Sequence, residues 1–311
     1  MLIQTGEPRT MMTIGPDFLN REISVNSEIV YHYTSASVLP VFFDKESDLY
    51  CTNSKCLNDP SEIYLGAKSF AKYLENGNVF DEDHSRLFRC NVEEALADDW
   101  FNAWIMSFSE RGDDLTQWRG YVDRSEGGFA IGFNTRKLAA ALKELTPKLM
   151  SSVDVRSSNN IPYLAKCWYG EKDEDLIEKL YRYIFHACER DIIAYKEATL
   201  VNREVIHRLL STLLPMSVHI KHDAFKDEQE ARIVLFSPNC DYSEVKLLGK
   251  KPRLPLGIPK LGIAVSSLID RVYLSPHGNR DSLMAMVKWL KRKSGGNFEI
   301  ELSSIPYDPS R

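Results

Sequence analysis

Apolar and polar residues alternate along several short stretches of the chain, which is the pattern of half-buried β-strands. In residues 28–34 the side chains of Ile29, Tyr31 and Tyr33 alternate with Val30, His32 and Thr34, so His32 and Thr34 share one face of a predicted strand. In residues 104–109 the polar positions are serines, and Met106 and Phe108 lie on the opposite face. The same criteria predict further strands at residues 129–133, 217–220, 228–236, 271–274 and 298–303.

Helix signals separate these strands. Asp59 is placed to cap a helix, Pro60 suits its first turn, and Glu62 completes a capping box, so a helix is predicted to about residue 74. A helix at 136–145 is predicted to be capped by Asn134 or Thr135. Apolar spacing also predicts short helical segments at 38–43 and 115–121, two charged helices within 171–214, a Pro- and Gly-rich loop at 247–262 and a helix at 281–291.

The order of these elements argues for an α+β fold, with a mixed or antiparallel central sheet and helices packed outside it. A regular alternation of strand and helix, typical of parallel sheets, is absent from the pattern. We expect residues 1–26 to form a polar extension without periodicity. Residues 27–311 then form one domain, interrupted by the helical insertion at about 171–214.

Composition narrows the class of protein. The 311 residues are 43% hydrophobic and 27% charged, as in ordinary globular proteins, and the formal net charge of -5 gives no bulk sign of nucleic-acid binding. A local basic groove remains compatible with that charge. No run of about 18 apolar residues and no signal-peptide pattern occurs, and the six cysteines are scattered. We therefore expect a cytoplasmic protein with reduced thiols and no membrane contact.

The segment from residue 221 to residue 232 is the most informative one. If a strand begins at Glu228, then Glu228, Glu230 and Arg232 project from the same face. Two neighbouring carboxylates on one sheet face repel each other, and Arg232 is placed to compensate them. This pattern has two interpretations, which are a structural Glu–Arg network and a catalytic or metal-binding carboxylate held by Arg232.

Three other polar positions have similarly open interpretations. His32 is either a hydrogen-bonded structural residue or a ligand-binding one, and the hydroxyls of Ser107 and Ser109 share a strand face without the Gly-x-Ser-x-Gly turn of a nucleophilic hydrolase. Trp118 and Tyr121 are most simply core aromatics, with a platform for a flat ring as the alternative. Gly127 and Gly128 do not form a dinucleotide-binding fingerprint, and no P-loop, HExxH or paired CxxC motif occurs.

Several of these motifs occur in the order found in a bacterial family known only as domain of unknown function 2971, which the chain resembles from about residue 30 to its C-terminus. The family's activity is largely uncharacterised, so the resemblance implies relationship more than function. The matching segments are residues 31–33, 57–62, 107–109, 118–121, 127–133, 221–232 and 305–307.

A more distant resemblance suggests chemistry. A first-strand His, a Ser-x-Ser strand and a late Glu-x-Glu strand are similar to the three-part NAD site of ADP-ribosyltransferases, whose sheet is split. The resemblance implies that Glu230 stabilises the positive charge that develops as nicotinamide leaves, and that Glu228 orients the acceptor. The other residues implied to bind NAD are His32 and Thr34 of the first strand, Ser107 and Ser109 as braces, Tyr121 as the stacking ring, and Arg232.

The function expected from this resemblance is cleavage of the nicotinamide–ribose bond of NAD, by a transferase or glycohydrolase acting as a toxin or antiphage defence effector. NAD would be the substrate, no metal is expected, and the acceptor would be a protein or a nucleic acid. One alternative is a metal-dependent nuclease that uses Glu228, Glu230 and Asp59. The other is a non-catalytic sensor whose partner surface is the helical insertion.

Overall fold

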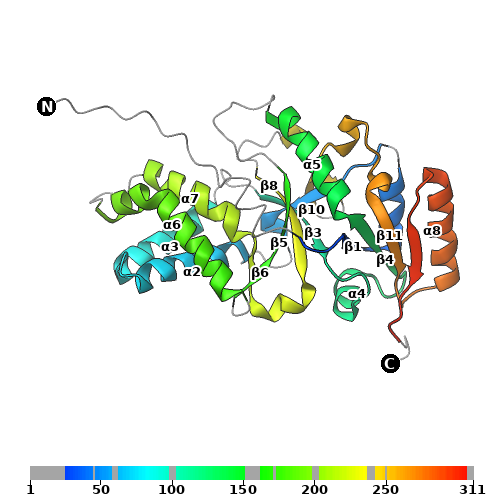
Figure 1. Cartoon of the computed structure of the whole chain (residues 1–311), viewed down its shortest axis with the longest axis horizontal. Helices are drawn as coiled ribbons and strands as arrows, with labels where there is room; N and C mark the ends of the chain where they lie inside the picture. The colour runs from blue at the N-terminus through cyan, green and yellow to red at the C-terminus, as the bar shows by residue number, and fades with distance from the viewer. Residues whose placement is uncertain are drawn as a thin grey trace.

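The computed structural model describes residues 25–44, 46–57, 62–97, 103–150, 162–170, 173–197, 203–236, 242–248 and 251–306. The predicted α+β class is confirmed, because a mostly antiparallel sheet is packed between helices (Figure 1). The predicted N-terminal extension lies outside the described residues except for Val25 and Asn26. The predicted helix start at residues 58–61 also lies outside them.

The central sheet contains ten strands within the described ranges. Its main path runs β12-β11-β4-β1-β3-β2-β10-β9, and β8 and β5 continue from the other edge of β3. Within this sheet the β11–β12 pair is parallel and the other described pairs are antiparallel. The strands are β1 (Ile29–Ser35), β2 (Tyr50–Asn53), β3 (Ala103–Ser109), β4 (Gly128–Asn134), β5 (Tyr163–Lys166), β8 (Glu230–Phe236), β9 (Lys246–Leu248), β10 (Lys251–Pro255), β11 (Ile269–Leu274) and β12 (Glu299–Leu302).

Strand β3 changes its partner along one edge. It pairs with β1 only at Tyr31 and Ser109, and with β2 only at residues 104 and 105. Its other edge is paired with β8 along the whole strand. The sheet therefore opens between β1 and β3, next to the two serines.

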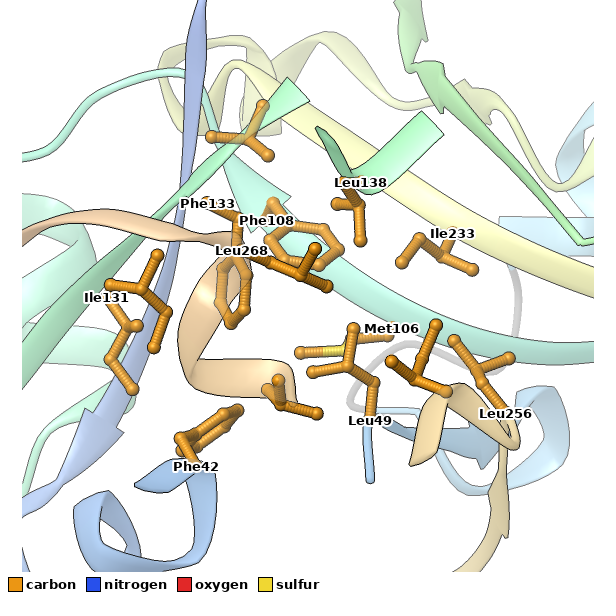
Figure 2. Packing of buried hydrophobic residues seen from close by; sticks show 14 of the residues in the cluster. Phe42, Leu49, Met106, Phe108, Ile131, Phe133, Leu138, Ile233, Leu256 and Leu268 are labelled. Carbon is orange, nitrogen blue, oxygen red and sulfur yellow. The ribbon is translucent and has the colours of Figure 1, made fainter. Parts of the chain in front are cut away.

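One face of the sheet carries a large apolar core. Side chains from β1, β3, β4, β8 and β11 meet those of α5 (Thr135–Met150), α8 (Arg280–Ser294) and the 3-10 segment η1 (Ala36–Phe43). Figure 2 shows the centre of this core, where Phe108 and Phe133 lie close together with their ring centroids 5.7 Å apart. Asn134 begins α5 as expected, because its side chain accepts a hydrogen bond from the backbone of Lys137.

The opposite face is covered in two separate parts. One apolar cluster joins the start of β3 and the end of β8 to four helices, which are α2 (Glu62–Asn76), α3 (Glu82–Ala97), α6 (Glu174–Glu197) and α7 (Arg203–Ser217). Figure 1 shows these four helices grouped at the end of the molecule away from α8. The short helix α4 (Leu115–Tyr121) forms a second, smaller cluster with β1, through Trp118, Tyr31 and Tyr33. The two predicted helices of the insertion are therefore part of a packed layer.

Three local expectations were wrong. Glu228 does not begin a strand, because it ends the 3-10 segment η3 (Asp223–Glu228), and β8 starts at Glu230. The predicted 247–262 loop contains β10, in which Pro252 lies opposite Leu247 of β9 and the pairing with β2 begins only at Arg253. The predicted strand at 217–220 is reduced to β7 (Ile220–Lys221), which pairs with β6 (Trp168–Tyr169). Helix α3 was not predicted.

Among the described residues, no helix combines the length and apolar character needed to cross a membrane.

Candidate functional site

The three polar motifs singled out in the sequence meet at one open pocket of about 70 Å³. It lies on the face of the sheet that carries α4, where β3 and β8 approach α4 and η3. The volume is below the ~300–1,000 Å³ of common ligand pockets, so the pocket fits one ring or small group and a larger ligand would extend outside. The lining residues are Tyr31, His32, Tyr33, Ser107, Phe108, Ser109, Gln117, Tyr121, Glu228 and Glu230.

The pocket arises from a change of side-chain chemistry along two paired strands. On β3 and β8 the opposed residues Ile105 and Val234 belong to the apolar cluster under the four helices. Two residues further along each strand, Ser107 lies opposite Arg232, and after them Ser109 lies opposite Glu230. Because side chains alternate between the two faces of a strand, all of these polar groups face the same side. The polar floor therefore begins where the helical layer ends.

Two carboxylates that line the pocket, Glu228 and Glu230, are held by two cations behind them, Lys221 and Arg232. Arg232 donates from Nε to Oε1 of Glu230 at 2.7 Å and from Nη2 to Oε2 at 2.9 Å, which makes a bidentate pair. Lys221 Nζ donates to Glu230 Oε2 at 2.6 Å and to Glu228 Oε2 at 2.7 Å. The formal charges of two carboxylates and two cations sum to zero, so the predicted repulsion between Glu228 and Glu230 is compensated.

Glu230 is the most strongly held member of this cluster. Its side chain is only 6% exposed, and burial by itself would raise its pKa. The adjacent positive charges of Arg232 and Lys221 outweigh that burial and lower the pKa of Glu230 to about 2. The carboxylate is therefore ionised at neutral pH.

This pKa predicts acid sensitivity. The folded chain holds Glu230 ionised below its ordinary value of 4.5, so the stabilisation is complete above about pH 4.5 and is lost as the pH falls toward about 2. We expect the urea midpoint of the wild type to fall over that interval more steeply than that of Glu230→Gln, which has no group to protonate there. Equal slopes for the two proteins in urea titrations monitored by circular dichroism would contradict this expectation.

Glu228 has a different environment although it shares Lys221. It ends η3, and the next residue, Gln229, takes a left-handed conformation with φ 42° that redirects the chain into β8. Its side chain is 15% exposed. Within the described part of the chain, its Oε2 is bound by Lys221 and its Oε1 has no hydrogen-bond partner. Glu228 is therefore the carboxylate with an oxygen available to a molecule in the pocket.

The two serines differ in the same way. The Ser109 hydroxyl donates to the Glu228 carbonyl at 2.8 Å and accepts from the Arg111 backbone at 3.1 Å, so it fixes the end of η3 against β3. The Ser107 hydroxyl is partly exposed and, among the described residues, has no partner. Ser109 consequently has a structural role at the end of η3, and Ser107 has, among the described residues, a hydroxyl without a partner in the pocket. The bracing of NAD that the resemblance implied for both serines stays a prediction.

The first-strand residues are placed less favourably for binding. His32 pairs with Ile131 of β4, so its side chain belongs to the opposite face from Glu230, and its ring lies 5.7 Å from Phe42 and 5.9 Å from Phe108. Its Nδ1 lies 3.0 Å from the Ser107 carbonyl, which can only accept, so Nδ1 carries a proton. Burial lowers the pKa of His32, which favours the neutral ring. Its imidazole thus bridges the opening between β1 and β3.

Thr34 lies on the same face as His32, is buried, and is not among the residues that line the pocket. Its predicted place in a binding site is therefore not supported by the geometry. The expectation that Tyr31 and Tyr33 face away from His32 is correct. However, their face is the one that holds the pocket.

The aromatic residues of α4 are divided between core and pocket. Trp118 is fully buried, lies 4.7 Å from the Tyr33 ring, and donates from Nε1 to Asp113 at 2.8 Å. Tyr121 is 42% exposed at the edge of the pocket, so its interpretation as a core residue was wrong and the alternative of an accessible ring fits better.

Sequence reasoning assigned no role to two residues that matter here. Lys221 binds the carboxylates of Glu228 and Glu230, which follow it by seven and nine residues. The η3 segment between them folds the chain back so that these side chains meet. Gln117 is a buried amide on α4 that lines the pocket. The sequence shows that Gln117 is next to Trp118 in a predicted helix. It does not show that the Gln117 side chain lines a pocket, because that depends on how α4 packs against the sheet.

No group of three or more His, Cys, Asp or Glu side chains suited to a metal ion occurs among the described residues. Asp59, the third ligand of the nuclease alternative, lies outside them. Lys221 and Arg232 already occupy three acceptor positions on Glu230 and one on Glu228, so the carboxylates present little net negative charge to a cation.

Comparison with known proteins gives one relationship. Residues 117–233 match a family described as protein of unknown function (DUF2971). The match extends from α4 to β8 and includes Gln117, Tyr121, Glu228, Glu230 and Arg232, but not β1 or β3. No curated protein and no solved structure matches the chain, so the resemblance to ADP-ribosyltransferases has no support from these comparisons.

Proposed function

We propose that the protein cleaves the bond between nicotinamide and ribose in NAD, as an ADP-ribosyltransferase or an NAD glycohydrolase. The observation that carries this proposal is the convergence of two glutamates, two serines and an accessible tyrosine ring on one pocket. The pocket lies beside the opening between β1 and β3, as the resemblance to a split transferase sheet implies. Its size suits one ring, with the remainder of a dinucleotide lying outside.

The chemistry requires stabilisation of a positive charge. The C1′–N1 bond breaks, its electron pair leaves with nicotinamide as the neutral base, and the ribose carbon becomes oxocarbenium-like. The oxygen of water or of an acceptor hydroxyl then bonds to that carbon and loses its proton to solvent. A fixed carboxylate stabilises the developing charge more in the transition state than in the bound substrate.

The geometry favours Glu228 as the carboxylate that contacts the ribose. Its Oε1 has no hydrogen-bond partner among the residues that the structure describes, whereas both oxygens of Glu230 are bound. We therefore assign charge stabilisation to Glu228, and assign to Glu230 the role of holding Lys221 and Arg232 in place. This moves the charge-stabilising role, which the resemblance gave to Glu230, to Glu228, and gives Glu230 a positioning role. Tyr121, at the edge of the pocket, is the ring placed to stack on nicotinamide.

The experiment that tests this proposal is measurement of nicotinamide release from NAD by the purified full chain, with and without cell extract as a source of acceptor. Release by the protein alone is expected for a glycohydrolase, and release that depends on extract is expected for a transferase. Folded protein that releases no nicotinamide in either condition would overturn the proposal. A parallel incubation with Mg²⁺ or Mn²⁺ and nucleic acid would then test the nuclease alternative.

A further inference from the structure

The Gln117 side chain has a property that the charged cluster does not explain. It is only 6% exposed and lines the pocket. Neither its amide nitrogen nor its amide oxygen has a hydrogen-bond partner among the described residues. Its amide nitrogen and oxygen are not among the fully buried polar atoms without a partner, so both reach the solvent in the pocket. A ligand that displaces this water must offer the amide a donor and an acceptor, because a polar group left unsatisfied costs about 1–3 kcal/mol.

The backbone that carries Gln117 is firmly positioned. Asp114 caps α4 by accepting from the backbone of Thr116 at 2.8 Å and of Gln117 at 3.2 Å. The adjacent Asp113 accepts from Trp118 and also from the Ser303 hydroxyl at 2.6 Å, which ties α4 to the C-terminal segment. Because both aspartates hold the start of the short helix, the backbone that carries the amide has a fixed place beside the pocket.

We propose that Gln117 determines ligand specificity by recognising a carboxamide. An amide offers a donor and an acceptor side by side, so two amides can form paired hydrogen bonds whichever way the Gln117 group is oriented. A carboxylate on the ligand offers acceptors only, and it would also lie in the pocket that holds the Glu228 carboxylate. The site therefore selects a planar ring with a carboxamide over the same ring with a carboxylate.

This inference rests on the proposed function, because nicotinamide is the carboxamide that NAD carries, and it adds a residue and a selectivity to it. The role is one of specificity, distinct from the charge stabilisation assigned to Glu228. Removal of the amide should therefore change the preference between ligands more than the rate of bond cleavage.

The test compares binding of nicotinamide and nicotinic acid to the full chain by isothermal titration calorimetry. The proteins are the wild type, Gln117→Met, which keeps the length of the side chain without its polar atoms, and Thr116→Met as a control on the exposed neighbour. We expect the wild type to prefer nicotinamide. Gln117→Met should weaken nicotinamide binding about tenfold and lose the preference, with an unchanged melting temperature, and Thr116→Met should match the wild type.

The outcomes separate the two proposals. Binding of nicotinamide that depends on Gln117, in a protein that releases none from NAD, would overturn the proposed function and retain the inference. NAD cleavage with the same KM and the same preference in Gln117→Met would overturn the inference and retain the function. A wild type that binds nicotinamide no better than nicotinic acid would also overturn the inference. If Gln117→Met is unstable, Gln117→Leu provides a second apolar variant for the same comparison.

Discussion

Replacement of Arg232 by methionine is expected to lower the free energy of unfolding by about 3–5 kcal/mol. Arg232 is fully enclosed and binds both oxygens of Glu230, so its removal leaves a buried carboxylate with Lys221 as its remaining charged partner. The free energy can be measured by urea unfolding at neutral pH. A matched control is Arg86→Met, because Arg86 forms an exposed pair with Asp83 at 2.8 Å, and its loss should cost under about 1 kcal/mol.

The double variant Arg232→Met, Glu230→Leu separates the cost of an unpaired charge from the cost of lost packing. Removal of both groups leaves no buried Glu230 carboxylate without its arginine, and Lys221 keeps Glu228 as a partner at 2.7 Å, so the double variant should be more stable than Arg232→Met alone. Additive losses from the two single substitutions would contradict the view that the pair acts as a unit. In that case the contribution of Arg232 would be mainly that of its packed side chain.

Replacement of Glu228 by glutamine is expected to reduce kcat/KM for nicotinamide release about 100- to 1,000-fold, with little change in stability. Glutamine keeps the size of the side chain but removes the negative charge that stabilises the oxocarbenium-like transition state. Glu230→Gln should instead lower both turnover and the melting temperature, because Arg232 and Lys221 lose their common partner. The contrast between these two variants distinguishes a residue that contacts the substrate from one that acts through its neighbours.

Glu244→Gln is a suitable control for the loss of a carboxylate. Glu244 forms an exposed ion pair with Lys260 at 3.0 Å and is not among the residues that line the pocket. Its substitution should leave both turnover and melting temperature unchanged. Full turnover in Glu228→Gln would remove Glu228 from the mechanism, and a stable, inactive Glu230→Gln would restore to Glu230 the catalytic role that the resemblance implied.

Both interpretations of the late Glu-x-Glu motif have a place in this arrangement. The structural interpretation accounts for Arg232 and Glu230, which form a closed and neutral pair within the sheet. It does not account for the Glu228 oxygen or for the Gln117 amide, neither of which has a hydrogen-bond partner in the described part of the chain. A network needed only for folding has no requirement for polar groups directed into an open pocket, which is why the functional hypothesis is attached to these two residues.

The helical insertion illustrates a different limit of sequence reasoning. Its charged outer positions correctly predicted two helices, because apolar residues recur at helical spacing in α6 and α7. The same pattern cannot identify the partner of the apolar face. In the structure that apolar face packs with α2 and α3 over the sheet. The four helices therefore cover one part of the sheet face on which the pocket lies.

Local patterns in the sequence determined the fold class, the strands β1, β3, β4 and β11, and the helices α4, α5 and α8, because strand alternation, helical spacing and capping depend on near neighbours in the chain. They also identified the three motifs that line the pocket. The tertiary structure decided which face of β1 meets the pocket and that Lys221 joins both carboxylates. It also decided that, within the described ranges, Glu228 rather than Glu230 keeps an oxygen without a hydrogen-bond partner. These facts depend on the pairing of β1 with β4, on the left-handed turn at Gln229 and on the docking of α4, each of which brings together residues that no local pattern relates.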